Sequence, residues 1–184
     1  MTTRPGLTLN HIGLYAHDLN KLEDFYTRVL GFTVTDRGDL PIPGGSVTLV
    51  FLSRDPEDHH QIALASGRPA QIPYNIVNQI SLKADSLTTL KKLLVNLKKE
   101  GITDITTISH GNALSMYVHD PEGNRLELFM DLPWYVTQPM REPMDLTLSE
   151  NEIFANAEKH ARAQPGFMLR TAWRAKMVER MGMA

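Results

Sequence analysis

The stretch Asn10-His11-Ile12-Gly13-Leu14 recurs 68 residues later as Asn78-Gln79-Ile80-Ser81-Leu82. The same offset aligns three further pairs without a gap: Ala16 with Ala84, Leu19 with Leu87, and Leu22 with Leu90. Each copy begins with an alternating segment that is typical of a strand and continues with apolar residues at helical spacing. Because the identities share one offset and the elements share one order, the pattern favours an internal duplication over chance similarity between amphipathic segments.

Each copy is predicted to have the element order βαβββ. The opening strands are expected at 9–16 and 76–84, and each leads into a helix with its apolar residues on one face. Gly31 is expected to end the first helix, whereas Ser86 caps the second helix and Gly101 ends it. Residues that favour turns then separate three strands in each copy, expected at 32–36, 46–52 and 60–65, and at 105–109, 114–119 and 125–130.

The composition limits the classes of function. The chain has 184 residues, of which 42% are hydrophobic and 22% charged, as in an ordinary soluble globular protein with a sizeable core. Its net charge of -2 gives no basic excess for a phosphate backbone, so nucleic acid is not an expected partner. The lack of cysteine excludes disulfides, thiolate metal sites and cysteine catalysis. Residues 1–5 lack the features of a signal peptide and no apolar run could span a bilayer, so a cytoplasmic protein without a membrane partner is expected.

The composition changes near Trp134. Three prolines punctuate an irregular segment, 132–148, which we call the strap. The residues that follow, Ser149 to Glu152, predict a capping box that opens a helix. A last helix, expected at 168–181, carries an apolar stripe for packing on the sheets or on a second subunit, and the strap is either a lid or a dimer contact. The expected division is therefore a domain at 1–133, with modules at 7–67 and 74–131, followed by the strap and helices at 134–184.

Strand alternation places three polar side chains away from the predicted core. His11, Gln79 and Glu127 each alternate with apolar neighbours, and His11 and Gln79 occupy equivalent positions of the repeat. If the two copies face each other around a pseudo-twofold axis, the three side chains converge. They then offer one imidazole nitrogen and two oxygen donors, a set that suits Fe(II), Mn(II), Ni(II) or Zn(II). The spacing alone is a weak signal for a metal site, because a single histidine in a strand is more often a hydrogen-bonded structural residue and Glu127 could be an exposed residue of the sheet.

Three features together resemble the vicinal oxygen chelate superfamily. They are the paired βαβββ modules, Asn10-His11-Ile12 with the helix end Tyr26…Val29-Leu30-Gly31-Phe32, and the segment Asp120-Pro121-Glu122-Gly123-Asn124-Arg125-Leu126-Glu127. The superfamily includes glyoxalase I, fosfomycin and bleomycin resistance proteins, and type I extradiol catechol dioxygenases. The resemblance covers about residues 7–131. It implies an α+β fold in which two βαβββ modules form a cupped mixed sheet around a metal site, plus a C-terminal helical extension.

Within the superfamily, the chain is most similar to the catalytic domain of extradiol dioxygenases, which hold Fe(II) with two histidines and one glutamate. The resemblance implies that His11 is the first ligand and Glu127 the carboxylate ligand, while the second imidazole position falls on Gln79. A neutral amide oxygen is a poorer donor to Fe(II) than imidazole, so this departure puts the identity of the metal in doubt. Glyoxalase I uses a glutamine ligand on an equivalent strand, so a glutamine here need not mean loss of the metal.

Three further residues resemble catalytic residues of the dioxygenases. His60 matches the distal histidine that acts as acid and base, His110 a histidine beside the substrate hydroxyl, and Tyr117 a tyrosine that hydrogen-bonds the catecholate. The resemblance thus implies an extradiol dioxygenase that acts on an aromatic diol with O2, uses a divalent metal (Fe(II) before Mn(II), Ni(II) or Zn(II)) and forms a homo-oligomer. Two alternatives stay open: another metalloenzyme of the glyoxalase, isomerase or thiol-transferase type, and a metal-free binding protein of the resistance type.

Overall fold

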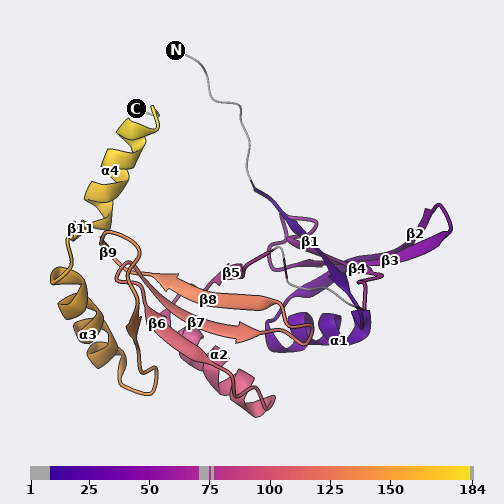
Figure 1. Cartoon of the computed structure of the whole chain (residues 1–184), viewed down its shortest axis with the longest axis horizontal. Helices are drawn as coiled ribbons and strands as arrows, with labels where there is room; N and C mark the ends of the chain where they lie inside the picture. Colours follow the sequence, from indigo (N-terminus) through magenta and orange to yellow (C-terminus); the bar gives the residue numbers. More distant parts are fainter. Residues whose placement is uncertain (1–8, 71–74, 76, 183–184) are drawn as a thin grey trace. The chain divides into compact units, whose positions relative to one another are not determined.

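Each copy of the predicted βαβββ repeat forms a sheet of its own in the computed structural model, which describes residues 9–70, 75 and 77–182 (Figure 1). The contacts divide the chain into two units. The first runs to residue 76 and includes the turn Asp120–Gly123, and the second comprises Val77–His119 and the chain from Asn124 onward. The predicted α+β class and the duplicated element order are therefore confirmed.

The first unit contains a four-stranded sheet in the order β1-β4-β3-β2, with β1 parallel to β4. Its elements are β1 (Ile12–Ala16), α1 (Leu19–Asp24), η1 (Phe25–Val29), β2 (Thr33–Ile42), β3 (Gly45–Ser53) and β4 (Ile62–Ser66). The predicted first helix is continuous only as far as Asp24, where it widens into the π-helical turn η1. This turn buries Phe25, Tyr26 and Val29 together, and Gly31 ends it at a φ of 73°.

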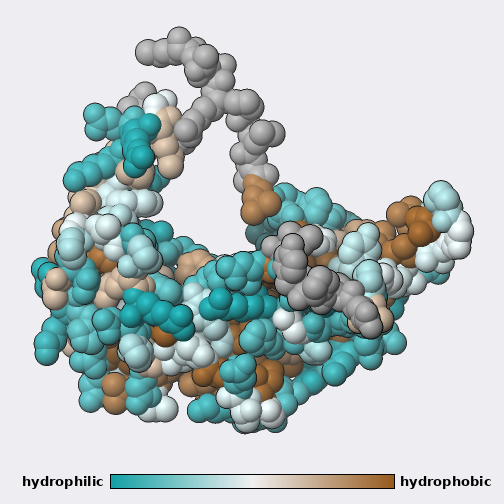
Figure 2. All heavy atoms as spheres, in the orientation of Figure 1, coloured by the Kyte–Doolittle hydropathy of each residue, from teal (hydrophilic) through white to brown (hydrophobic). Residues whose placement is uncertain are grey.

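The β2–β3 hairpin is longer than the sequence pattern predicts. β2 was expected to end at Asp36 but continues to Ile42, whereas β4 pairs only with Leu49–Leu52 of β3. The outer half of the hairpin is therefore a two-stranded ribbon, on which Leu40 and Ile42 are 51% and 44% exposed, and apolar side chains gather there (Figure 2). The alternation of apolar and polar residues did not predict the length of β2, because neither face of this ribbon is buried.

The second unit repeats the same topology. Its elements are β5 (Ile80–Lys83), α2 (Leu87–Lys99), β6 (Thr106–Ser109), β7 (Ala113–His119) and β8 (Arg125–Asp131), with β5 parallel to β8 and β7 antiparallel to it. Ser86 caps α2 as predicted, because its side chain accepts a hydrogen bond from the Thr89 amide. The start expected for β5, residue 76, lies outside the described residues.

The chain after residue 132 packs with this second unit. It contains β9 (Trp134–Tyr135), β10 (Glu142–Pro143), α3 (Glu150–Arg162), β11 (Met168–Leu169) and α4 (Arg170–Arg180), and β10 pairs with the edge strand β6. The predicted capping box of α3 is confirmed. Most apolar side chains of the strap are buried: Leu132, Trp134, Val136, Met140 and Leu146. The domain boundary expected at residue 133 stays a prediction.

The last helix, α4, packs through only part of the stripe predicted for it. Its Trp173 ring stacks on Tyr135 with the centroids 5.3 Å apart, but α4 has no buried residue and Met181 is 43% exposed. Arg170 at its start pairs with Asp131 at the end of β8. Within the described part of the chain, no helix is long and apolar enough to cross a membrane.

The Asp-Pro-Glu-Gly turn is explained by its hydrogen bonds in the first unit. Both backbone amides of His17 and Asp18 donate to Oε1 of Glu122, each at 2.8 Å, just before α1 begins. Arg68 donates to Oε2 of Glu122 at 3.2 Å, and the side chains of Arg68 and Glu122 are only 10% and 5% exposed. The backbone amide of Glu122 in turn donates to Asp120. Glu122 therefore fixes the start of α1, and with it the loop after β1.

Candidate active site

The register of the second sheet lines up three polar side chains on adjacent strands. Ser81 of β5 pairs with Glu127 of β8, and Glu127 pairs with Tyr117 of β7. Residues directly opposite each other across strands share a face, so the three side chains form a row. Leu126 and Leu128 are buried on the opposite face, as the alternation predicted. The parallel pairing of β5 with β8 thus brings the repeated segment that contains Ser81 next to Glu127.

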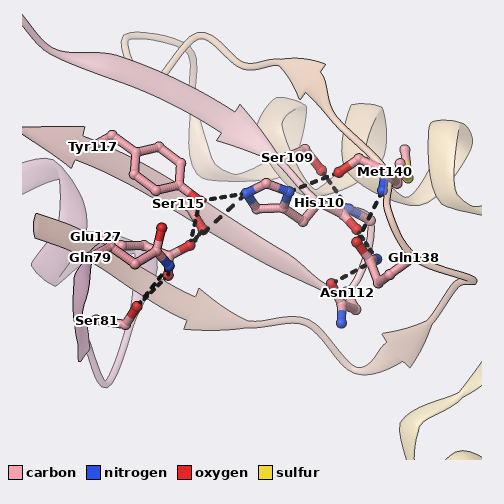
Figure 3. Close-up of polar contacts among 11 residues, drawn as sticks. Gln79, Ser81, Ser109, His110, Asn112, Ser115, Tyr117, Glu127, Gln138 and Met140 are labelled. Carbon is pink, nitrogen blue, oxygen red and sulfur yellow. Dashed lines mark hydrogen bonds and ion pairs between the residues drawn. The ribbon is translucent and has the colours of Figure 1, made fainter. Parts of the chain in front are cut away.

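The carboxylate of Glu127 accepts four hydrogen bonds (Figure 3). Ser115 and Tyr117 donate to Oε1, both at 2.8 Å, while Gln79 Nε2 and Ser81 donate to Oε2 at 2.8 and 2.6 Å. Burial alone would raise the pKa of Glu127, but the hydrogen bonds from Ser81, Tyr117 and Ser115 outweigh it and hold the pKa below its ordinary value. Glu127 is therefore an ionised carboxylate at neutral pH.

The orientation of the Gln79 amide follows from these contacts. Its nitrogen lies 2.8 Å from Oε2 of Glu127 and 3.1 Å from the Ser81 hydroxyl. The carboxylate can only accept, and Ser81 uses its proton on the same carboxylate, so both neighbours offer acceptors to Gln79. The NH2 end of the amide therefore faces Glu127.

His110 lies beyond β6, in the turn that leads to β7. Its Nδ1 is 2.8 Å from the backbone carbonyl of Met140, and its Nε2 is 2.8 Å from the Tyr117 hydroxyl (Figure 3). Because a carbonyl only accepts, Nδ1 carries a proton and Nε2 is the nitrogen that faces Tyr117. Burial, together with the hydrogen bond to Glu127 and its charge, raises the pKa of Tyr117 to about 12. Tyr117 thus keeps its single proton at neutral pH, with an acceptor on either side.

The first unit holds the other two predicted histidines side by side. The ring centroids of His11 and His60 are 4.3 Å apart. His11 Nδ1 is 2.9 Å from Asn10 Oδ1, and the Asn10 amide nitrogen donates to Asp58, which fixes the orientation of that amide. Neutral His11 therefore carries its proton on Nδ1 and its lone pair on Nε2.

His60 is held in its neutral form. Burial lowers its pKa most, repulsion from His11 and His59 whenever these rings are protonated lowers it further, and Asp58 raises it in part. Its ring also packs on Phe51, with the centroids 4.9 Å apart. A neutral imidazole can take up a proton at neutral pH, as an acid–base residue must.

The predicted site residues thus form two sets, one in each unit. Gln79, His110, Tyr117 and Glu127 form one connected hydrogen-bond network in the second unit, and His11 and His60 are in contact in the first. No group of three or more His, Asp or Glu side chains among the described residues is arranged to hold a metal. Of the three predicted metal ligands, His11 and Glu127 are of these types, and they lie in different units.

Three partners of Glu127 and His110 were not among the predicted site residues. Ser81 and Ser115 lie two residues from Gln79 and Tyr117, so strand alternation alone would have placed all four on the site face. The Met140 carbonyl belongs to the backbone and carries no side-chain signal in the sequence.

Comparison with known proteins identifies relatives of this chain. Residues 8–128 match the model of the Glyoxalase/Bleomycin resistance protein/Dioxygenase superfamily. A biphenyl-2,3-diol 1,2-dioxygenase from Rhodococcus globerulus is 30% identical over 135 residues, which span 71% of this chain but only 65% of the relative.

Two solved structures share the fold. A glyoxylase/bleomycin resistance protein/dioxygenase domain from Frankia sp. EAN1pec matches with a TM-score of 0.56 at 21% identity over 71% of this chain and 94% of that one. The fosfomycin resistance protein FosX from Listeria monocytogenes, solved with Mn(II) and sulfate, matches with a TM-score of 0.51 at 16% identity over 71% and 95%. The family model covers more than half of the chain, and the chain therefore belongs to the glyoxalase, bleomycin resistance protein and dioxygenase superfamily.

Proposed function

We propose that this protein is an extradiol ring-cleaving dioxygenase that acts on a catechol-type aromatic diol with O2. The observation that carries the proposal is the chain of contacts from His110 through Tyr117 to Glu127. The Tyr117 hydroxyl lies 2.8 Å from both Nε2 of His110 and Oε1 of Glu127. It places a proton donor and a proton acceptor beside an ionised carboxylate, as a site that binds a diol and moves its proton requires. The dioxygenase named among the relatives supports the same reaction.

The proposed metal ligands are His11, Gln79 and Glu127, with Fe(II) as the first candidate and Mn(II), Ni(II) or Zn(II) as alternatives. The donor chemistry fits a divalent cation: neutral His11 has its lone pair on Nε2, and Glu127 is ionised. Gln79 uses its nitrogen on Glu127, so it would bind the metal through its carbonyl oxygen. A bound metal of this kind would polarise a chelated diol and lower the pKa of its hydroxyl groups.

The chain's own residues then orient the substrate and carry protons. The Tyr117 hydroxyl can donate to only one acceptor at a time, so a substrate oxygen beside it would compete with Glu127 and His110 for that proton. Nδ1 of His60 contacts Nδ1 of His59 at 2.9 Å, which leaves Nε2 of His60 to exchange a proton with the substrate. His60→Ala should therefore slow turnover more than it weakens diol binding.

A second candidate function, metal-free binding of an aromatic ligand, is favoured by one observation. Glu127 already accepts four hydrogen bonds, which is the number of lone-pair sites that a carboxylate offers. Its charge is thus stabilised without a cation. A metal must displace at least one of these donors, whereas a ligand that leaves the network intact need not.

Metal analysis separates these functions. The protein would be purified without oxygen, its metals measured by mass spectrometry before and after incubation with Fe(II), and O2 uptake followed with a panel of catechols. Near-stoichiometric iron with diol-dependent O2 uptake supports the dioxygenase, and Glu127→Ala should abolish both. Glu158→Ala is the matched control, because Glu158 forms only an exposed pair with Arg162. Mn, Ni or Zn without O2 uptake would indicate the isomerase or transferase type, and binding of a catechol without metal would indicate a binding protein.

A further inference from the structure

The strap reaches the candidate active site through Gln138. The side-chain nitrogen of Gln138 donates to the backbone carbonyl of His110 at 2.7 Å and to the Asn112 side chain at 3.2 Å (Figure 3). Its side-chain oxygen accepts from the backbone amide of Met140 at 3.0 Å. One side chain therefore ties the turn that carries His110 to the strap residue that contacts the His110 ring.

The contact between Met140 and the His110 ring fixes the tautomer of the histidine. Nδ1 of His110 must donate to the Met140 carbonyl, so Nε2 is the nitrogen directed at the Tyr117 hydroxyl. Without that carbonyl, the proton could move to Nε2 and the ring could turn about its χ2 angle. The position of one backbone carbonyl in the strap thus decides which nitrogen takes part in the network around Glu127.

Close packing holds the strap against this turn. Gly111, which follows His110, has a φ of 74°, and a Cβ atom built on it would lie 2.4 Å from both Met140 Sδ and Val136 Cγ2. The strap also adds β10 to the sheet beside β6, where Glu142 pairs with Ser109. The strap is therefore seated on the turn by backbone pairing and side-chain packing, and Gln138 adds the polar clamp.

We propose that Gln138 is a positioning residue that holds His110 as the Nδ1–H tautomer with Nε2 facing Tyr117, so that the strap completes the active site. The family match ends at residue 128, before the strap begins, so the matched region lacks this part of the site. Only the kinetic consequence rests on the proposed dioxygenase function. The effect on the histidine itself does not.

The first test is nitrogen NMR of the His110 ring in the full chain. It would be recorded without metal and again with diamagnetic Zn(II), and a His110→Gln variant identifies the signal. We expect the pattern of a single Nδ1–H tautomer in the wild type, and a mixture of tautomers with faster exchange of the ring proton in Gln138→Ala. Gln138→Glu keeps the acceptor for the Met140 amide but loses both donated bonds, so it should show the same change and serves if Gln138→Ala does not fold. Arg141→Ala, at an exposed position of the strap, should leave the signal unchanged.

The second test is kinetic. If catechols are cleaved, Gln138→Ala should lower kcat about tenfold and leave KM within about twofold, because a misplaced proton carrier affects the reaction more than binding. An unchanged His110 signal in both Gln138 variants would overturn the inference, even if O2 uptake confirms the dioxygenase. A shifted tautomer in a protein that cleaves no catechol would support the inference and reject the proposed function.

Discussion

Glu122 should contribute more to the free energy of unfolding than an average charged residue does. Its carboxylate accepts from the amides of His17 and Asp18 and pairs with Arg68, and the paired side chains are only 5% and 10% exposed. Glu122→Ala removes this acceptor and leaves the guanidinium of Arg68 buried without its ion-pair partner. Such losses cost about 3–5 kcal/mol, because the remaining charge keeps its desolvation penalty. A domain is stable by only about 5–15 kcal/mol, so this would be a large share of the total.

Equilibrium unfolding in urea would measure the effect. For a chain of this length, each kcal/mol corresponds to about 2–4 °C in Tm, so Glu122→Ala should also lower Tm by at least about 6 °C. Glu158→Ala is the matched control. Glu158 lies 2.7 Å from Arg162 with both side chains exposed, and such pairs contribute about 0.3–0.5 kcal/mol.

Two further variants separate the two parts of this effect. Glu122→Gln keeps an acceptor for the two amides and loses only the charge, so it should cost less than Glu122→Ala. Arg68→Ala combined with Glu122→Ala removes both charges, so the pair should cost less than the sum of the single variants. If Glu122→Ala costs no more than Glu158→Ala, the idea that this turn anchors the start of α1 is wrong.

Contacts of Asp131, Gly111 and Tyr117 have consequences that can be measured. Hydrogen bonds and charges from Arg170 and Lys83 outweigh burial and hold the pKa of Asp131 below its ordinary value, so the stability it adds should be lost as pH falls through that lowered pKa. Asp131→Asn should flatten the decline in unfolding free energy as the pH falls below about pH 5, and an unchanged slope would count against this pairing. Gly111→Ala should lower Tm by several degrees, since its φ is 74° and the added Cβ would meet Met140, and an unaltered melting curve would mean that the strap yields freely. Tyr117→Phe should remove the tyrosine titration near pH 12 from the ultraviolet difference spectrum, because the pKa of Tyr117 is raised to about 12. It should also slow turnover at least tenfold, and equal activity would exclude Tyr117 from proton transfer.

The sequence predicts the fold well where one face of a strand is buried. In β8, Leu126 and Leu128 are covered by the core, so the alternation correctly puts Glu127 on the other face. The same reasoning misjudged the length of β2, where neither face is covered and hydrogen bonding to β3 alone sets the end of the strand. The alternation of apolar and polar residues thus indicates which face of a strand is buried, and it gives no information where neither face is buried.

The candidate site was predictable to the extent that it depends on strand position. The row of Ser81, Glu127 and Tyr117 is set by register, and register follows from the same buried faces. The contact of His110 with the Met140 carbonyl depends on how the strap returns to β6, across 30 residues of sequence. Nothing in the side-chain pattern of the strap specifies that return, so the resemblance could name His110 but not what orients it.

Gln79 is the residue on which the two candidate functions divide. A neutral imidazole at this position would give a metal its nitrogen lone pair, whereas the amide has a weaker oxygen donor and also gives a hydrogen bond from its nitrogen to Glu127, which stabilises the carboxylate without a metal. A metal at Glu127 competes with such bonds, each worth about 1.5–3 kcal/mol when the acceptor is charged. At about 1.4 kcal/mol per factor of ten, exchanging one bond weakens metal binding by roughly ten- to a hundredfold. The difference in metal-binding free energy between a metalloenzyme and a metal-free binding protein therefore corresponds to about one hydrogen bond. A measurement of the affinity for Fe(II) distinguishes the two functions more directly than any further similarity to the family.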